Sequence, residues 1–213
     1  MKNLMPLILI FLIGTVWAED NPSIKAQSRL NQLTASYVNT ALFEANFTQT
    51  KQVKFMHQPL VSSGRIKFAQ GHGFLWIIDK PFQSKTWVNQ DGVFKANQFE
   101  GKKQVKDPQM KAVAGVLSDL LSAQVDQVAQ KFTVSDDTPD IDTLWQVTLR
   151  PNTALMKKVL LRIEVIGTDS GAENSQGIQR IIVTDSNQNV TEIEFSRIKQ
   201  QHKPLTDQQI SEF

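Results

Sequence analysis

One apolar stretch in the first half of the chain decides the fold class, and it reads Phe74-Leu75-Trp76-Ile77-Ile78-Asp79-Lys80-Pro81-Phe82. Alternate side chains of a β-strand lie on the same face of a sheet, so Phe74, Trp76 and Ile78 share one apolar face. Pro81 has no backbone N–H to donate to a ladder and therefore ends the strand. We expect a buried strand over residues 74–80.

Further short strands surround this one, and turn signals separate them. Gln90-Asp91-Gly92 is typical of a hairpin turn. The other predicted strands cover residues 43–47, 64–68, 85–89, 93–97, 98–105, 132–135, 145–150, 159–166, 178–185 and 190–197. Polar loops are predicted at residues 136–142 and 167–177. This succession of short strands indicates a mostly antiparallel meander.

Two segments that begin with proline predict helices. Asn21-Pro22 and Asp107-Pro108 each place a capping side chain before a proline at the first helical position. The first helix is predicted over residues 22–39. The second helix is predicted from an apolar stripe of helical period, which consists of Met110, Val113, Leu117, Leu120 and Leu121. Val125 and Val128 predict a further short helix after it. Because these helices do not alternate with strands, we expect a strongly curved antiparallel sheet with helices on its concave side.

The first eighteen residues have the pattern of a secretory signal peptide. Lys2 gives a basic start, residues 4–13 are almost wholly apolar, and Val16 and Ala18 occupy the two small-residue positions of a cleavage site. The alternative is an uncleaved membrane anchor, but the apolar run is shorter than the roughly 20 residues that span a bilayer. We expect cleavage after Ala18, which leaves residues 19–213 as a single domain outside the cytoplasm.

Composition excludes several classes of protein and predicts no reactive site. The chain has no cysteine, so it has no disulfide, thiol nucleophile or thiolate metal ligand. Without Lys2 it has 22 basic and 21 acidic residues, a net charge near +1 that predicts no nucleic-acid surface. His57, His72 and His202 lack metal-ligand spacing, and Ser62-Ser63-Gly64 lacks the strand and helix of a nucleophile elbow. We expect no metal, no cofactor and no catalytic residue.

Several motifs taken together resemble a known family. They are Leu42-Phe43-Glu44-Ala45-Asn46-Phe47-Thr48-Gln49-Thr50-Lys51, Gly64-Arg65-Ile66-Lys67-Phe68, the apolar strand that ends in Lys80-Pro81, Trp87, and Asp91-Gly92. In this order they resemble the periplasmic outer-membrane lipoprotein carrier family, LolA, over nearly the whole mature chain. The resemblance implies a mainly β fold: an unclosed, strongly curved antiparallel β-barrel with an N-terminal helix and inserted helices that cover the concave face as a lid.

The resemblance also implies a function without chemistry. An apolar cavity would hold the acyl chains of lipoproteins that cross the periplasm. The cargo would come from an inner-membrane ABC transporter complex and pass to an outer-membrane receptor. We therefore expect a monomeric periplasmic protein that is not an enzyme and binds an acylated lipoprotein or another lipid.

Strand alternation selects the side chains expected to line this cavity, which are Phe47, Ile66, Phe68, Phe74, Trp76, Ile78, Trp87 and Phe94. The alternative for each of them is an ordinary place in a filled core, because burial and cavity lining call for the same residue types. The stripe on the second helix would form the lid, and its residues are Met110, Val113, Leu117, Leu120 and Leu121.

One position departs from the family pattern. The family has an arginine immediately before the proline, which hydrogen-bonds to the lid, and here that residue is Lys80. Lysine offers a point charge where arginine offers a rigid fork of five donors. Counting along the strand places Lys80 on the face of Trp76 and Ile78, so we expect it to latch the C-terminal end of a lid helix. The alternative is a side chain that extends into solvent from the strand end.

Three other functions stay open. The stretch of residues 59–64 resembles a divergent subgroup, which would carry a glycolipid or a polyene lipid. An exported lipid hydrolase would need a nucleophile and a base, and no local motif supplies them. A structural β-protein would have the same fold with a filled core and no cavity.

Overall fold

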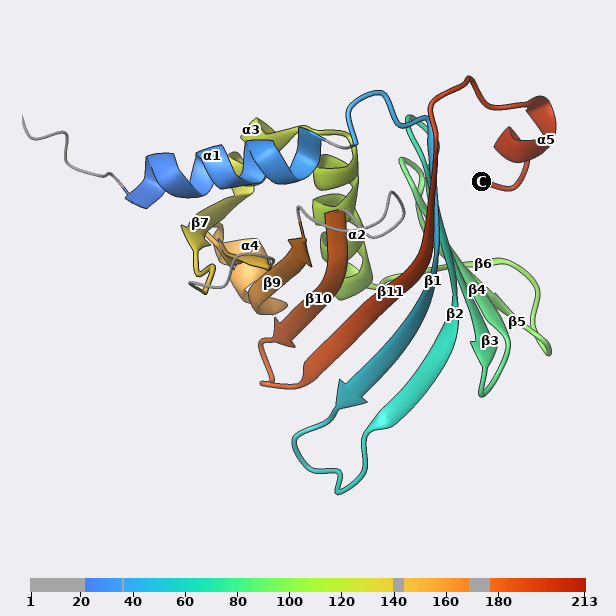
Figure 1. Ribbon diagram of the computed structural model, residues 1–213. Helices are drawn as coiled ribbons and strands as arrows, with labels where there is room; N and C mark the ends of the chain where they lie inside the picture. The colour runs from blue at the N-terminus through green and yellow to red at the C-terminus, as the bar shows by residue number, and fades with distance from the viewer. Residues whose placement is uncertain (1–21, 36, 140–143, 169–176) are drawn as a thin grey trace, which may run out of the picture.

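One antiparallel sheet dominates the computed structural model, which describes residues 22–35, 37–139, 144–168 and 177–213 (Figure 1). The expected signal peptide lies outside these residues. Within them the sheet has eleven strands: β1 (Leu42–Gln52), β2 (Leu60–Ala69), β3 (Gly73–Lys80), β4 (Ser84–Asn89), β5 (Gly92–Asn97), β6 (Lys103–Val105), β7 (Phe132–Asp136), β8 (Trp145–Pro151), β9 (Leu160–Thr168), β10 (Gly177–Asp185) and β11 (Val190–Gln201).

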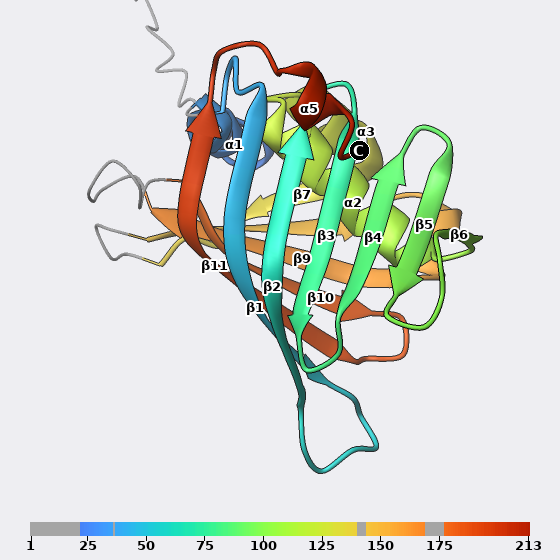
Figure 2. The ribbon, with the colours of Figure 1, turned by 90° about the vertical axis from the view of Figure 1, so that its right-hand side faces the viewer.

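The strand order brings the first and the last strand together at the middle of the sheet. It runs β6-β5-β4-β3-β2-β1-β11-β10-β9-β8-β7, so β1 pairs with its neighbour β2 on one side and with the last strand on the other. The sheet curves strongly, but β6 and β7 stay unpaired edges (Figures 1 and 2). The predicted fold class, an unclosed antiparallel barrel with helices, is therefore confirmed.

Five helices accompany the sheet in the described part of the chain: α1 (Pro22–Ala35), α2 (Pro108–Leu121), α3 (Val125–Lys131), α4 (Ala154–Lys157) and α5 (Asp207–Ile210). Figures 1 and 2 show α2 and α3 inside the curve of the sheet and α5 on its outer side. Helix α1 packs against α3 and β7. Leu117, Leu120 and Leu121 of α2 are almost completely buried, because the concave face supplies the apolar surface that this stripe needs.

The concave face can be followed across the strands from their register. Ala45 pairs with Ile66, Ile66 with Trp76, Trp76 with Thr86, and Thr86 with Lys95. Directly paired residues of an antiparallel sheet project to the same face. All but Lys95 are buried, so the core lies between this face and α2. Towards β5, however, the face becomes polar.

Some predicted elements differ from the observed ones at their ends. The first helix stops at Ala35, and Asn39 adopts a left-handed conformation with φ of 65° before β1 begins. The strand predicted over residues 98–105 is reduced to β6. Helices α4 and α5 were not predicted, although α5 has a readable signal: Thr206 and Gln209 form a capping box at its start.

The chain's single tyrosine joins α1 to the sheet. Tyr37 is 1% exposed, and its oxygen accepts a hydrogen bond of 2.8 Å from the backbone N–H of Ile178. Burial raises the pKa of Tyr37 to about 12, although the N–H of Ile178 favours the ionised form.

This pKa predicts a loss of stability in alkali. The unfolded chain releases the tyrosine proton near pH 10, whereas the folded chain holds it until about pH 12. The folded state is therefore stabilised below pH 10, and the free energy of unfolding falls between pH 10 and 12 by about 3 kcal/mol. Denaturant titrations of the wild type and Tyr37→Phe across this range will measure the difference. Tyrosinate absorbance reports Tyr37 directly, and ionisation of the folded protein at pH 10 would contradict the assignment.

Candidate functional site

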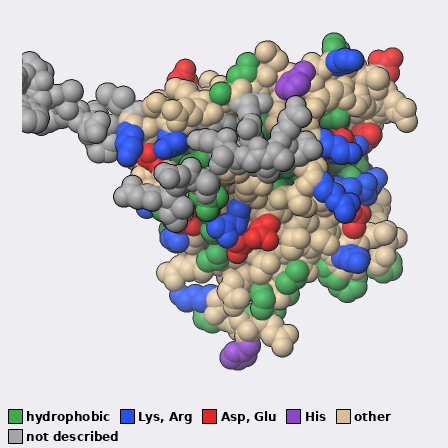
Figure 3. All heavy atoms as spheres, viewed as in Figure 1, with side chains coloured by type: hydrophobic (Ala, Val, Ile, Leu, Met, Phe, Trp, Pro, Cys, Tyr) green, Lys and Arg blue, Asp and Glu red, His purple; other side chains and the backbone are tan. Residues whose placement is uncertain are grey.

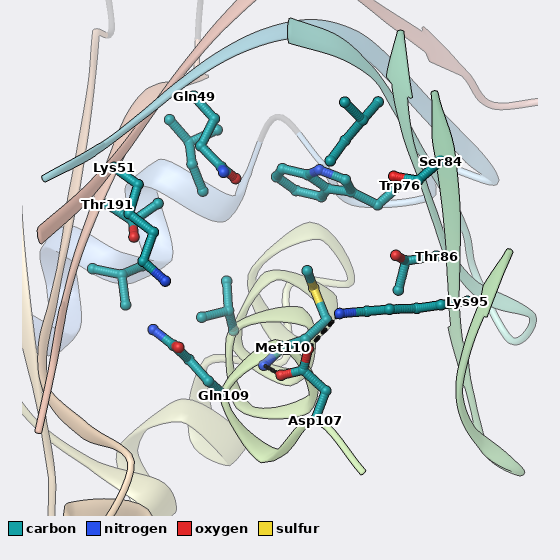
Figure 4. A pocket seen from close by; sticks show the side chains of 14 residues that line it. Gln49, Lys51, Trp76, Ser84, Thr86, Lys95, Asp107, Gln109, Met110 and Thr191 are labelled. Atoms are coloured by element: carbon teal, nitrogen blue, oxygen red, sulfur yellow. Dashed lines mark hydrogen bonds and ion pairs between the residues drawn. The ribbon is translucent and has the colours of Figure 1, made fainter. Parts of the chain in front are cut away.

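A cavity of about 280 Å³ lies between the first turns of α2 and the concave face of the sheet (Figure 4). This volume is near the lower end of the roughly 300–1,000 Å³ typical of small-molecule sites. Six apolar and eight polar side chains line it: Trp76, Ile78, Met110, Val113, Val183 and Ile193, then Gln49, Lys51, Ser84, Thr86, Lys95, Asp107, Gln109 and Thr191. The mixed lining fits a ligand with both a polar and an apolar part.

The start of α2 is fixed over this cavity by two side chains. Asp107 caps the helix by accepting a hydrogen bond of 2.9 Å from the backbone N–H of Met110. Its other carboxylate oxygen accepts one of 2.7 Å from Nζ of Lys95 on β5. Burial alone would raise the pKa of Asp107. The hydrogen bonds from Lys95 and Met110 and the charges of Lys95 and Lys51 outweigh that effect and hold the pKa below its usual value.

The residues predicted to line the cavity fall into three groups. Trp76 and Ile78 border the cavity as predicted. Phe47, Ile66, Phe68 and Phe74 lie on the same concave face, but they are at most 4% exposed and belong to the packed core. Phe47 supports Trp76, since their ring centroids are 4.3 Å apart. Of these six residues, only Trp76 and Ile78 reach the cavity in this structure.

The third group, Trp87 and Phe94, lies on the opposite, convex face of the sheet, so the prediction that these two residues line the cavity was wrong. Trp87 pairs with Leu75, whereas Trp76 pairs with Thr86. The indole N–H of Trp87 donates a hydrogen bond of 2.9 Å to the carbonyl oxygen of Glu212 beyond α5. The ammonium of Lys102 lies 4.6 Å from the ring of Trp87 and 5.2 Å from that of Phe94. These contacts cover the two aromatic rings on the convex side.

The predicted position of Lys80 was also wrong. Ser63 pairs with Lys80 but Gly64 pairs with Ile78, so Asp79 is an extra residue without a partner in β2. Such a bulge breaks the alternation of faces that the prediction counted on. Lys80 is exposed and does not line the cavity, and its side chain makes no hydrogen bond or ion pair with the described residues. The cation that pairs with the capping residue of α2 is Lys95, which was not predicted from the sequence.

The five residues of the predicted lid stripe occupy two environments along α2. Met110 and Val113, in its first half, border the cavity. Leu117, Leu120 and Leu121, in its second half, are at most 3% exposed and pack into the core. A lid movement would therefore displace the N-terminal half of α2 at lower cost than the C-terminal half, because fewer packing contacts would be lost.

Exposed apolar side chains gather at the end of the sheet nearest to the cavity. The connections β1–β2, β3–β4 and β5–β6 all lie at this end, since the intervening strands are antiparallel. We call their large exposed residues the apolar rim: Phe55, Met56, Leu60, Val61, Phe82 and Phe99. Figure 3 shows hydrophobic side chains around the projecting β1–β2 hairpin. Apolar surface of this kind is typical of contact sites for proteins or lipids.

The described residues offer neither a metal site nor a membrane-spanning helix. None of their His, Asp and Glu side chains form a group of three or more that could hold a metal ion. No described helix combines the length and the apolar character that a membrane crossing requires.

The curved open sheet and the cavity under α2 define an open-barrel β-protein with a helix-covered cavity. The family model of the outer membrane lipoprotein carrier protein LolA matches residues 38–209, and the chain belongs to this family. No match was found among curated proteins.

Solved structures that are similar to this chain have very different sequences. A DUF1329 family protein from Desulfovibrio piger is 11% identical, with a TM-score of 0.52 over 88% of this chain and 96% of its own. A LolA superfamily protein from Nitrosomonas europaea is also 11% identical, with a TM-score of 0.48 over 86% and 96%.

The Lys95–Asp107 pair predicts a measurable effect on ligand exchange. Lys95→Met removes the ion pair but keeps Asp107 as the helix cap. Because both partners are partly exposed, we expect a loss of about 0.5–1 kcal/mol and dissociation of a fluorescent fatty acid about two to five times faster. Lys85→Met is the control, since Lys85 is an exposed lysine of β4 on the opposite face of the sheet, where it pairs with Ile77. Equal rates in both variants would exclude Lys95 as a latch.

Proposed function

We propose that this protein is a periplasmic carrier that binds the acyl chains of lipoproteins and ferries them from the inner to the outer membrane. The observation that carries the proposal is the cavity under α2, in a chain whose match to the LolA family covers residues 38–209. Trp76, Ile78 and Val113 supply apolar surface for an acyl chain. The signal peptide pattern of residues 1–18 supports export to the periplasm.

The carrier would exchange cargo with proteins of both membranes. An inner-membrane ABC transporter complex would donate the lipoprotein, and an outer-membrane receptor would accept it. The apolar rim supports this part of the proposal, because it lies at the end of the sheet next to the cavity and its phenylalanines are highly exposed: Phe55 by 89%, Phe82 by 75% and Phe99 by 86%.

The size of the cavity sets a requirement for this function. A volume of about 280 Å³ is small for a lipoprotein with several acyl chains. Binding would therefore displace the first half of α2, where Met110 and Val113 border the cavity. Methionine suits such a place, since its unbranched side chain adapts to different neighbours.

A second candidate function rests on the polar lining. Eight polar side chains are more than an acyl chain alone requires, and they favour a carrier of another lipid with a larger polar part. The catalytic alternative has less support, because none of the described histidines lines the cavity that holds Ser84, as the base of a triad would.

One experiment separates these functions. The full chain is expressed with its signal peptide, purified from the periplasm and mixed with membranes that hold a labelled triacylated lipoprotein. A soluble complex with the lipoprotein supports the carrier, whereas mass spectrometry of a co-purified phospholipid or glycolipid alone supports the second function. If neither species is found and the protein binds no fatty acid, both proposed functions are contradicted. N-terminal sequencing of the purified chain tests cleavage after Ala18.

A further inference from the structure

The polar side of the cavity is built from four residues of three elements. Gln49 and Lys51 lie at the end of β1, Thr191 lies at the start of β11 opposite Lys51, and Gln109 lies in the first turn of α2. In Figure 4 the side chains of Lys51 and Gln109 extend toward one another from β1 and α2. Strand pairing and the fixed helix start thus bring these groups to one place.

None of these four side chains has a directly bonded partner in the described part of the chain. Gln49, Lys51, Gln109 and Thr191 make no side-chain hydrogen bond or ion pair with the described part of the chain. Polar groups inside proteins are normally paired, so a convergent set that is not paired is available to a ligand or to water. The neighbouring Lys95 and Asp107 differ, since they bind each other.

The charge of the cavity selects an anion. Lys51 and Lys95 contribute two positive charges and Asp107 one negative charge, which gives +1 among the lining residues. The Asp107 carboxylate is already held by Lys95 and by the helix start, so the ammonium of Lys51 is left as the unneutralised charge. Lys51 is half-buried, and a partly desolvated ammonium gains most from an anionic acceptor.

We propose that Lys51, with Gln49, Gln109 and Thr191, binds the anionic headgroup of a lipid, a carboxylate or a phosphate. The acyl chain of the same molecule then lies against Trp76, Ile78 and Ile193, which form the apolar wall of the cavity. The inference rests on the proposed carrier function and adds to it the chemical class of the ligand. It also accounts for the polar lining that an acyl chain alone would not need.

The test compares ligands that differ only in the headgroup. Tetradecanoate, tetradecyl phosphate and tetradecanol have the same chain, and inorganic phosphate has none. We expect the wild type at pH 8 to bind the two anions about tenfold or more tightly than the alcohol, because a charge-assisted hydrogen bond contributes at least that factor. The more tightly bound anion identifies the headgroup as carboxylate or phosphate. Tight binding of inorganic phosphate alone would contradict a lipid site.

Three variants assign the effect to one residue. Lys51→Met keeps the length and removes the charge, so it should lose about tenfold in anion affinity and leave tetradecanol unchanged. Lys51→Arg should restore most of the difference. Lys85→Met is the matched control, since Lys85 is an exposed lysine of β4 that pairs with Ile77 on the convex face. Thermal unfolding of all variants shows whether each one is folded.

The outcomes separate this inference from the function on which it rests. Equal affinity of the wild type for tetradecanoate, tetradecyl phosphate and tetradecanol would overturn the headgroup site and leave the carrier intact. Binding of none of the three would overturn the carrier itself. A preference for anions that survives in Lys51→Met would assign the anion to another cation of the protein.

Discussion

Gly64→Ala is expected to destabilise the protein by at least about 3 kcal/mol, a large effect for the addition of one methyl group. A Cβ at Gly64 would lie 1.8 Å from the carbonyl oxygen of Ile77 and 2.9 Å from its carbonyl carbon. Both atoms belong to the backbone of β3, so no side-chain rotation can remove the clash. The paired strands β2 and β3 would have to separate at the bulge of Asp79.

The expected damage extends to the cavity. Gly64 pairs with Phe47 on one side and with Ile78 on the other, on the face that carries Trp76. The missing side chain leaves room for the rings of Phe47 and Trp76 to approach within 4.3 Å. A displaced β3 would move both Trp76 and Ile78, so ligand binding should fall together with stability.

A glycine without neighbours provides the control. A Cβ at Gly101, in the β5–β6 connection, meets no atom within 4 Å. Gly101→Ala should therefore change the free energy of unfolding by less than about 0.5 kcal/mol in a denaturant titration. If Gly64→Ala does not accumulate, its soluble yield relative to Gly101→Ala gives the same comparison. Equal stability of the two variants would show that β2 and β3 are less tightly apposed than the structure indicates.

The fold was predictable because its signals are local. The apolar alternation of residues 74–80, the turn at Asp91-Gly92 and the cap at Asp107-Pro108 each act within a few residues of the chain. They gave the strands near β3, the helix α2 and its buried stripe correctly. The resemblance to the LolA family supplied the open barrel, which short-range patterns alone leave undecided.

The site was only partly predictable, because it depends on register. Counting alternate residues was valid for Trp76 and Ile78 but failed at Lys80, where the extra residue Asp79 reverses the faces. It also gave the wrong face for Trp87, whose place depends on its pairing with Leu75 and on a hydrogen bond to a residue 125 positions away. Hydrophobicity does not distinguish the two faces when the outer one is covered as well.

The polar residues of the cavity lacked any sequence signal. Lys51 and Lys95 stand in alternating strands like many surface lysines, and only the curvature of the sheet brings them near Asp107. One weak sign was available: Gln49 and Lys51 share the parity of Phe47, so β1 continues its buried face with polar side chains. A change of this kind along one face can mark the point where a core becomes a cavity.

Trp76→Ala is expected to abolish binding of a fatty acid while the protein remains folded at reduced stability. Trp76 is 5% exposed, packs on Phe47 and borders the cavity. Loss of a core tryptophan costs about 3–5 kcal/mol, and Trp76 should lie at the lower end because part of its surface already faces the cavity. Without the ring, the apolar wall opposite α2 is gone, and the affinity should fall at least about tenfold.

Trp87→Ala is the matched control, because it removes the same side chain from the neighbouring strand on the opposite face. Trp87 is half-buried and contacts Glu212 and Lys102 rather than the cavity, so we expect a smaller loss of stability and unchanged affinity. A bromine-labelled fatty acid should quench part of the tryptophan emission of Trp87→Ala, in which Trp76 and Trp145 remain, and none of the emission of Trp76→Ala, in which Trp87 and Trp145 remain. Because bromine quenches only at short range, the reverse pattern would place the acyl chain on the convex face and refute a cavity beneath α2.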